Sequence, residues 1–258
     1  MQITTKISLI SILLINGNIA NAALSSVIAD YQAYYYQAQG IPYFISGLTV
    51  SGVLANTHAD LSIQTNWQQH IRNQFTNELS DRVDNYGDLA QYQVSIPIYL
   101  TALWLSHTFQ DHSSFDAIGK WSDHSLRTIF LGAPQQALLT QLLGSGRPLT
   151  ESSNWRWFKY NRAVSGHAFY GAVPLLNLAK QNDNIWIKLS AYTLSTLPAL
   201  ARINNNKHYT SQAFLGWWLA FSTTQIVWRE PIVSKKPQLT WQLMPIENTI
   251  CLGLNLKL

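Results

Sequence analysis

Two short stretches of this sequence bring together side chains that could hold a phosphate group and attack it. Residues 164–167 read Val-Ser-Gly-His, and downstream Arg202, His208 and Gln212 follow at intervals of six and four residues. A histidine can act as nucleophile or proton donor, and an arginine offers a planar set of donors that fits phosphate oxygens. Arg147, upstream of both stretches, could supply a second guanidinium group. Such a set of groups can act on a phosphate without a metal ion.

The first stretch stands where a helix is expected to begin. The unpaired amides and partial positive charge of a helix N-terminus attract anions. There Ser165 offers a hydroxyl, Gly166 lets the backbone approach a ligand closely, and His167 would face the same space. The alternative is purely structural, because serine is also a common N-cap residue.

The second stretch pairs a base with a group that can orient it. His208 follows a polar loop and is expected to open a helix, so Gln212 would lie one turn further along the same face. An acceptor at that point could fix the imidazole tautomer. The alternative is that both side chains cap and solvate the helix start, and that Arg147 is a solvated loop residue.

An amphipathic helix is predicted over 59–84. Its apolar stripe, at intervals of three to four residues with some gaps, comprises Leu61, Trp67, Ile71, Phe75, Leu79 and Val83. Polar side chains lie between them. The sequence Tyr-Gly-Asp at 86–88 is expected to end the helix.

Five further helices are expected over 94–109, 123–143, 165–180, 184–200 and 208–228. Gly144 is expected to stop the second of these, and Pro198 lies near the end of the fourth. Alternating residues over 239–243 and 250–258 predict a short C-terminal β-hairpin. The expected fold class is all-α, a helical bundle of about six helices with this hairpin.

The first 22 residues have the features of a secretory signal. A short positive start, an apolar run and the sequence Ala-Asn-Ala at 20–22 predict cleavage, with an uncleaved anchor as the alternative. The expected organisation is a signal peptide over 1–22, a helical domain over 23–230 and a tail or hairpin over 231–258. We therefore expect export to the periplasm. The single cysteine, Cys251, excludes an intramolecular disulfide.

Charge and hydropathy limit the classes of binding partner that the chain could have. A net charge of +4 from scattered basic residues excludes a nucleic-acid-binding surface. Residues 208–228 contain no Lys, Arg, Asp or Glu and are long enough to span a bilayer. Their several Ser, Thr and Gln side chains would however need partners in lipid. A soluble bundle is favoured, with peripheral membrane contact as the alternative.

Taken in order, the three pieces resemble the type 2 phosphatidic acid phosphatase/haloperoxidase superfamily. The pattern of that family is K-x6-R-P, then P-S-G-H, then S-R-x5-H-x3-D. The Arg-Pro pair at 147–148 matches the first motif, residues 165–167 match the second, and Arg202, His208 and position 212 match the third with its spacing intact. The resemblance covers about residues 55–230.

The resemblance implies phosphoryl transfer through a phosphohistidine. His208 would be the nucleophile, and His167 would protonate the leaving oxygen. The phosphate oxygens would be held by Arg147, Arg202, Ser165 and Gly166. The substrate would be a phosphate monoester or diphosphate on a small molecule or lipid. No cofactor is implied, although a similar pocket holds vanadate in the haloperoxidase branch.

Four positions depart from the family pattern. Thr140 stands in place of the lysine (Leu142 in a shifted alignment), Val164 in place of the proline and Ala201 in place of the serine. Gln212 stands in place of the aspartate that orients the nucleophile, and its amide brings no negative charge. In a serine protease, exchanging the orienting carboxylate for an amide lowers the rate by about 10⁴-fold.

Three functions are consistent with these residues. The first is a metal-independent phosphatase, and the second is a phosphate-binding protein that has lost efficient turnover. A vanadate-dependent haloperoxidase is the least favoured. His107, Asp111 and His112 could be metal ligands by residue type, but they lack a further partner in register. Trp155 and Trp157 could line the mouth of a pocket or belong to the core.

Overall fold

The chain forms two compact units, residues 1–228 and residues 229–258. The computed structural model describes residues 25–109, 113–229, 238–246 and 249–257, with only the backbone in the last two ranges. The expected signal peptide at 1–22 lies outside the described residues and stays a prediction.

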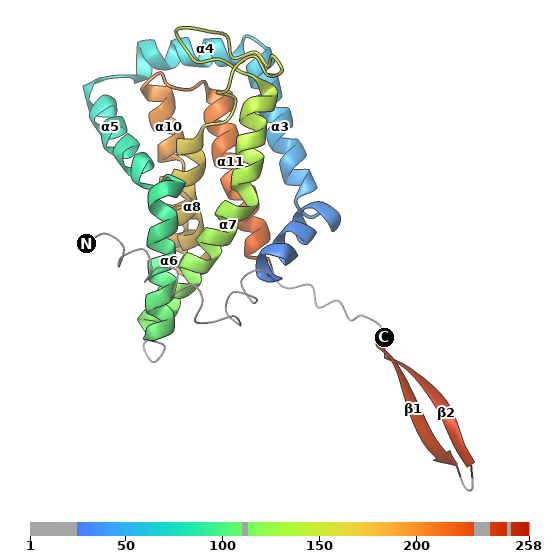
Figure 1. Cartoon of the computed structure of the whole chain (residues 1–258). Coiled ribbons are helices and arrows are strands. Elements are labelled where there is room, and N and C mark those ends of the chain that lie inside the picture. Colours follow the sequence, from blue (N-terminus) through green and yellow to red (C-terminus); the bar gives the residue numbers. More distant parts are fainter. Residues whose placement is uncertain (1–24, 110–112, 230–237, 247–248, 258) are drawn as a thin grey trace, which may run out of the picture. The chain divides into compact units, whose positions relative to one another are not determined.

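Helices make up the described part of the first unit (Figure 1). In chain order the nine α-helices are α3 (Ile41–Asn56), α4 (Ala59–Asn66), α5 (Gln74–Leu89), α6 (Tyr92–Thr108), α7 (Ser113–Leu143), α8 (Gly166–Gln181), α9 (Ile185–Ser195), α10 (Leu197–Asn204) and α11 (Thr210–Val227). Helical turns at 25–36 precede them. The all-α prediction is confirmed for this unit. No helix in its described part is both long and apolar enough to cross a membrane.

The prediction of about six helices was wrong because two expected helices are split and one was not expected. The helix predicted over 59–84 breaks at Asn73, whose side chain accepts the Thr76 N–H at 3.0 Å and caps α5. The helix predicted over 184–200 breaks at Thr196. Pro198 is the second residue of α10 rather than near a helix end, because a first turn tolerates the missing N–H. The apolar helix α3 has no charged residue to set its polar face and was not expected.

The ends of several helices also differ from the prediction. α5 continues through Gly87 to Leu89, and α7 begins ten residues earlier than expected, at Ser113. α7 ends at Leu143, directly before Gly144, as predicted. Gly144 has φ +61°, and a Cβ there would lie 1.8 Å from the carbonyl oxygen of Arg156. Only glycine fits this turn, which starts the long loop from 144 to 165.

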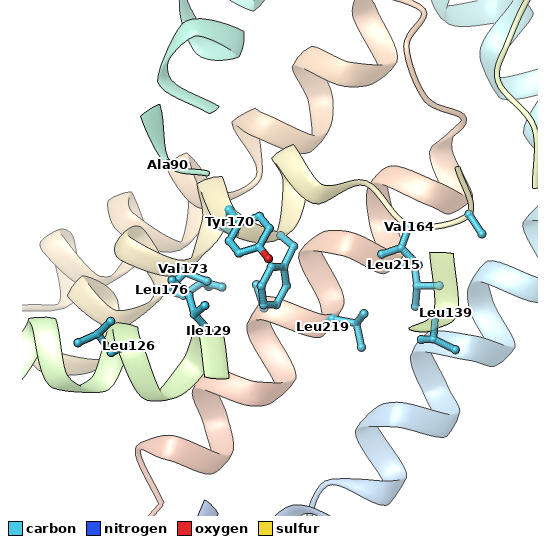
Figure 2. Packing of buried hydrophobic residues seen from close by; sticks show 14 of the residues in the cluster. Ala90, Leu126, Ile129, Leu139, Val164, Tyr170, Val173, Leu176, Leu215 and Leu219 are labelled. Atoms are coloured by element: carbon cyan, nitrogen blue, oxygen red, sulfur yellow. The ribbon is translucent and has the colours of Figure 1, made fainter. Parts of the chain in front are cut away.

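The core of the first unit is centred on α8. This helix packs against α5, α7, α9, α10 and α11. Figure 2 shows Tyr170, Val173 and Leu176 of α8 among Leu126 and Ile129 of α7 and Leu215 and Leu219 of α11. Since its side chains between 168 and 176 are largely buried, α8 is held from several sides and its N-terminus has a fixed position.

The amphipathic segment α4–α5 turns its apolar face to solvent and its polar face to the interior. Leu61 and Phe75, from the predicted apolar stripe, are 58 % and 73 % exposed. The polar residues Asp60, Ser80 and Asp84 are buried instead. The interior face of this segment is therefore the one that carries carboxylates and hydroxyls, which a sequence reading based on apolar periodicity does not anticipate.

The second unit contains two antiparallel strands, β1 (Gln238–Ile246) and β2 (Thr249–Lys257). Gln238 pairs with Lys257 at one end and Ile246 with Thr249 at the other. The side chains of this hairpin lie outside the described residues. Its predicted role in packing or surface contact therefore stays a prediction.

Candidate phosphate-binding site

The starts of α8 and α11 are joined directly through their backbones. The Ser165 N–H donates to the carbonyl oxygen of Gln212 at 3.0 Å. One turn further along α11, a Cβ on Gly216 would lie 2.3 Å from the carbonyl oxygen of Ser165. This close approach brings the second and third motifs together.

The hydrogen-bond partners of the Gln212 side-chain amide allow only one of its two orientations. Its Oε1 accepts the backbone N–H of Tyr209 at 3.2 Å, and its Nε2 donates to the carbonyl oxygen of Gly146 at 2.6 Å and to Ser145 Oγ at 2.7 Å. A backbone N–H can only donate and a carbonyl can only accept, so a flipped amide would set like groups against each other. Because Gln212 is fully buried, a flipped amide would lose these hydrogen bonds without replacement by water.

The fixed amide determines the tautomer of His208. Its Nδ1 lies 2.9 Å from Gln212 Oε1, which can only accept. Nδ1 must therefore carry the hydrogen, and Nε2 is left with a free lone pair. Gln212 therefore places an acceptor at His208 Nδ1, the position that the sequence analysis expected it to occupy. His208 does not open the helix as expected, however: it lies two residues before α11, with Tyr209 as the N-cap.

His208 is buried and surrounded by positive charge. Burial, and then the charge of Arg202, lower the pKa of His208 to about 3, and the charges of Arg147 and His167 act in the same direction. The hydrogen bond with Gln212 opposes this shift only in part. All four groups therefore lie near one another, and His208 is neutral at neutral pH.

The lowered pKa predicts a loss of stability in acid. The unfolded chain takes up a proton at His208 near its ordinary pKa of 6.5, whereas the folded chain does so only near 3. Between these values the unfolded state binds more protons, so stability falls as pH falls, by up to about 1.4 kcal/mol per pH unit from this group. Urea unfolding of wild type and His208→Gln at pH 7 and pH 4.5 should show the stability of the wild type relative to the variant decreasing. A constant difference would contradict the assignment.

Arg202 is held by a buried carboxylate that sequence reasoning missed. Its Nη1 lies 3.1 Å from Asp84 Oδ1, and Asp84 Oδ2 accepts from Lys207 Nζ at 2.9 Å and Asn205 Nδ2 at 2.8 Å. Burial alone would raise the pKa of Asp84, but these hydrogen bonds and the charge of Arg202 outweigh it and lower the pKa. The Nε of Arg202 is buried without a partner among the described residues. An anion would satisfy this donor.

We expect Asp84→Asn to act through Arg202. Removing the charge that pairs with the buried Arg202 guanidinium should destabilise the fold by about 3–5 kcal/mol. Because Arg202 would also lose its fixed orientation, phosphate binding should weaken by about tenfold or more. Thermal unfolding and calorimetric titration with inorganic phosphate would measure the two effects. The exposed Glu78→Gln on the same helix is the matched control and should change neither. Wild-type phosphate affinity in Asp84→Asn would remove Asp84 from this positioning role.

His167 is oriented by a second carboxylate of α5. Its Nε2 lies 2.7 Å from Asp88 Oδ1, where the imidazole N–H donates. Burial and the charge of Arg202 lower the pKa of His167, against the opposing effect of Asp88. Gly87 leaves room for the ring, because a Cβ there would lie 3.0 Å from His167 Cδ2. The spacing of Asp84 and Asp88, one turn apart on a polar face, was the sequence signal for this pair.

Ser165 does act as the N-cap of α8. Its Oγ accepts the Ala168 N–H at 3.3 Å and keeps its hydroxyl hydrogen for another acceptor. Gly166 is the first residue of the helix, where amides lack intrahelical partners. Thr140, at the family's lysine position, also lies here: its Oγ1 donates to the carbonyl oxygens of Gln136 (2.7 Å) and Val164 (3.3 Å). The position is beside the site, but its side chain is turned to the backbone.

A buried carboxylate holds the start of α11 in place. Asp60 of α4 accepts the Ser211 N–H at 2.9 Å and also pairs with the Ser211 hydroxyl. Burial raises the pKa of Asp60, although both bonds from Ser211 oppose that shift. Asp60 caps the helix that positions Gln212, and it was not identified from the sequence.

Arg147 lies on the loop from 144 to 165, close to the other groups but exposed to solvent. Burial, then the charges of Arg162 and Arg202, lower its pKa. This loop contacts Gln212 through the Ser145 hydroxyl and the Gly146 carbonyl, and it contacts α3 through Ser153, whose Oγ donates to the Ala55 carbonyl at 3.0 Å. Arg147 therefore stands at the open side of the site.

The remaining candidates from the sequence are not brought to this site. Trp155 is partly buried against the core and Trp157 is 68 % exposed. His107 lines a separate cavity of about 550 Å³ at the start of α7, the opposite end of that 31-residue helix from the site. Asp111 and His112 lie outside the described residues. Among the described ones, no three His, Cys, Asp or Glu side chains are grouped as metal ligands.

Comparisons with known proteins gave one similar structure. No family model matches the chain, and no curated protein matches it. Among solved structures, it is similar to a crystal structure described as the first transmembrane PAP2 type phosphatidylglycerolphosphate phosphatase, from Bacillus subtilis. The identity is 14 % and the TM-score 0.49, over 73 % of this chain and 94 % of that one.

Proposed function

We propose that this protein is a metal-independent phosphatase that hydrolyses a phosphate monoester or diphosphate through a phosphohistidine at His208. The observation that carries the proposal is the contact between His208 Nδ1 and Gln212 Oε1, which requires the hydrogen on Nδ1 and leaves Nε2 as the nucleophile among three groups that favour an anion. A phosphorylated small molecule or lipid is the proposed substrate.

The first half of the reaction transfers the phosphoryl group to the protein. The Nε2 lone pair of His208 forms a bond to phosphorus as the bond from phosphorus to the leaving oxygen breaks. Arg202 donates to the phosphate oxygens from its unpartnered Nε, with Arg147 at the open side and the Ser165 hydroxyl and Gly166 N–H at the helix start. The leaving oxygen takes a proton from His167, whose protonated form is favoured once a phosphate anion lies beside it.

The second half releases phosphate. Water gives a proton to the now neutral His167 and attacks phosphorus, the bond from Nε2 to phosphorus breaks, and His208 recovers its lone pair. Each proton that leaves His167 in the first step is returned in the second.

The test is phosphate release from an aryl phosphate by the purified protein in the presence of a chelator. Release that saturates with substrate and is inhibited competitively by vanadate would support the proposal, since vanadate can adopt the geometry of the transition state. No release above background would contradict it.

A phosphate-binding protein without efficient turnover is the second candidate. It is favoured by the amide, rather than a carboxylate, next to His208 Nδ1 and by Thr140, whose side chain bonds to backbone carbonyls and brings no charge. Calorimetric binding of inorganic phosphate without hydrolysis of any aryl phosphate would select this candidate over the first.

A further inference from the structure

Arg147 also lines a cavity of about 600 Å³. Its lining includes Arg147, Glu151, Lys159, Tyr160, Asn161 and Arg162. Of these residues only Arg147 belongs to one of the three motifs. The cavity therefore shares one cation with the phosphate-binding groups and adds two of its own.

The cavity carries an excess of positive charge. Three cations line it against one carboxylate, and Glu151 uses its Oε2 to accept the Arg147 backbone N–H at 3.3 Å. Within the described residues no ion pair joins Arg147, Lys159 or Arg162 to a carboxylate. Positive groups that outnumber the carboxylates in a hollow attract anions and bind them with charge-assisted hydrogen bonds.

The backbone that carries these cations is fixed. The Arg162 N–H donates to the Ser145 carbonyl at 3.2 Å, next to the segment that bears Arg147. The Lys159 N–H donates to the Arg156 carbonyl at 2.9 Å, and the preceding Phe158 is held at φ 58°. A bulky residue in this left-handed region is a strained arrangement, of the kind found where a loop has a set shape.

We propose that this cavity is a second anion site, which takes a further acidic group of the substrate while the phosphate to be cleaved lies at His208. This rests on the proposed function for the identity of the first site. Arg147, shared between the two, would contact both groups. The substrate class is then a phosphate compound with a second phosphate or carboxylate, and Lys159 and Arg162 determine specificity for it.

Calorimetric titration can separate this inference from the proposed reaction. The probes are inorganic phosphate and methylenediphosphonate, a non-hydrolysable compound with two acidic groups. We expect wild type to bind the diphosphonate about tenfold or more tightly than phosphate. In the double variant Lys159→Gln/Arg162→Gln this preference should disappear while phosphate affinity stays within about twofold. Lys188 is a half-buried lysine on α9, and Lys188→Gln is the matched control that should keep the preference.

Each result decides one of the two claims. A preference that survives in the double variant, or is missing from wild type, would overturn the second site even if the protein hydrolyses aryl phosphates. A preference that the double variant loses would support the second site even if no hydrolysis is found, and only the phosphatase proposal would then fail. Failure of wild type to bind either probe would also overturn the second site.

Discussion

Replacing His208 by alanine should lower phosphate release from an aryl phosphate by about 10⁴-fold or more, because the variant has no group to form the covalent intermediate. Arg202, Arg147 and His167, the charged groups that act on His208, are retained and still attract an anion. Phosphate affinity should therefore persist, and the loss should appear in kcat. Initial rates in the presence of a chelator, together with calorimetric titration by phosphate, measure both quantities.

His70→Ala is the matched control for this experiment. His70 is an exposed histidine in the π-helical turn Trp67–Ile71, and its removal should leave kcat and the affinity for phosphate unchanged. Activity of His208→Ala comparable with wild type would mean that another group attacks phosphorus. Equal loss in both variants would point to a general effect on folding.

Gln212→Leu should lower kcat by about 10²–10⁴-fold, with little effect on the affinity for phosphate. Leucine has a similar size but cannot accept the Nδ1–H of His208, so the ring is free to adopt the other tautomer. The change also leaves the Tyr209 N–H and the Gly146 carbonyl without their buried partner, and stability should fall by about 1–3 kcal/mol for each. Nitrogen-15 NMR of His208 should show protonated Nδ1 and unprotonated Nε2 in wild type and a mixture in the variant.

Replacing Gln212 by a residue with a carboxylate is not expected simply to raise kcat. The resembled motif has aspartate where this sequence has Gln212, so sequence alone would predict that Gln212→Asp raises the rate. The structure changes that expectation, because Gln212→Asp is one methylene shorter and lacks the amide that donates to Ser145 and Gly146. Gln212→Glu has the right length but sets an oxygen against the Gly146 carbonyl. An increase in kcat in either variant would show that the missing negative charge limits the wild type more than the lost hydrogen bonds do.

The parts of the site that lie within one short motif could be predicted from the sequence. Arg202, His208 and Gln212 lie close together because the chain between α10 and α11 is short, and Ser165 caps α8 as a serine before a helix is expected to do. The stop at Gly144 was likewise predictable from the glycine itself. These features depend on local spacing, which the sequence shows directly.

The parts that depend on distant segments could not be predicted. Asp84 and Asp88 share a face of α5, but the pattern does not tell which face turns inward, and the apolar one turns outward here. The orientation of the Gln212 amide depends on Ser145 and Gly146, almost seventy positions earlier. The sequence shows a threonine, Thr140, where the resembled motif has lysine, whereas the cations of the neighbouring cavity became apparent only once the loop was placed.

Trapping the covalent intermediate tests the central claim most directly. Protein mixed with a phosphorus-32-labelled aryl phosphate and quenched in alkali should carry label on His208, bonded at Nε2, as peptide mapping and comparison with the two phosphohistidine isomers would show. His208→Ala should carry none. Label at Nδ1, on another residue, or absent from wild type while phosphate is being released would contradict the account of how Gln212 prepares His208 to attack.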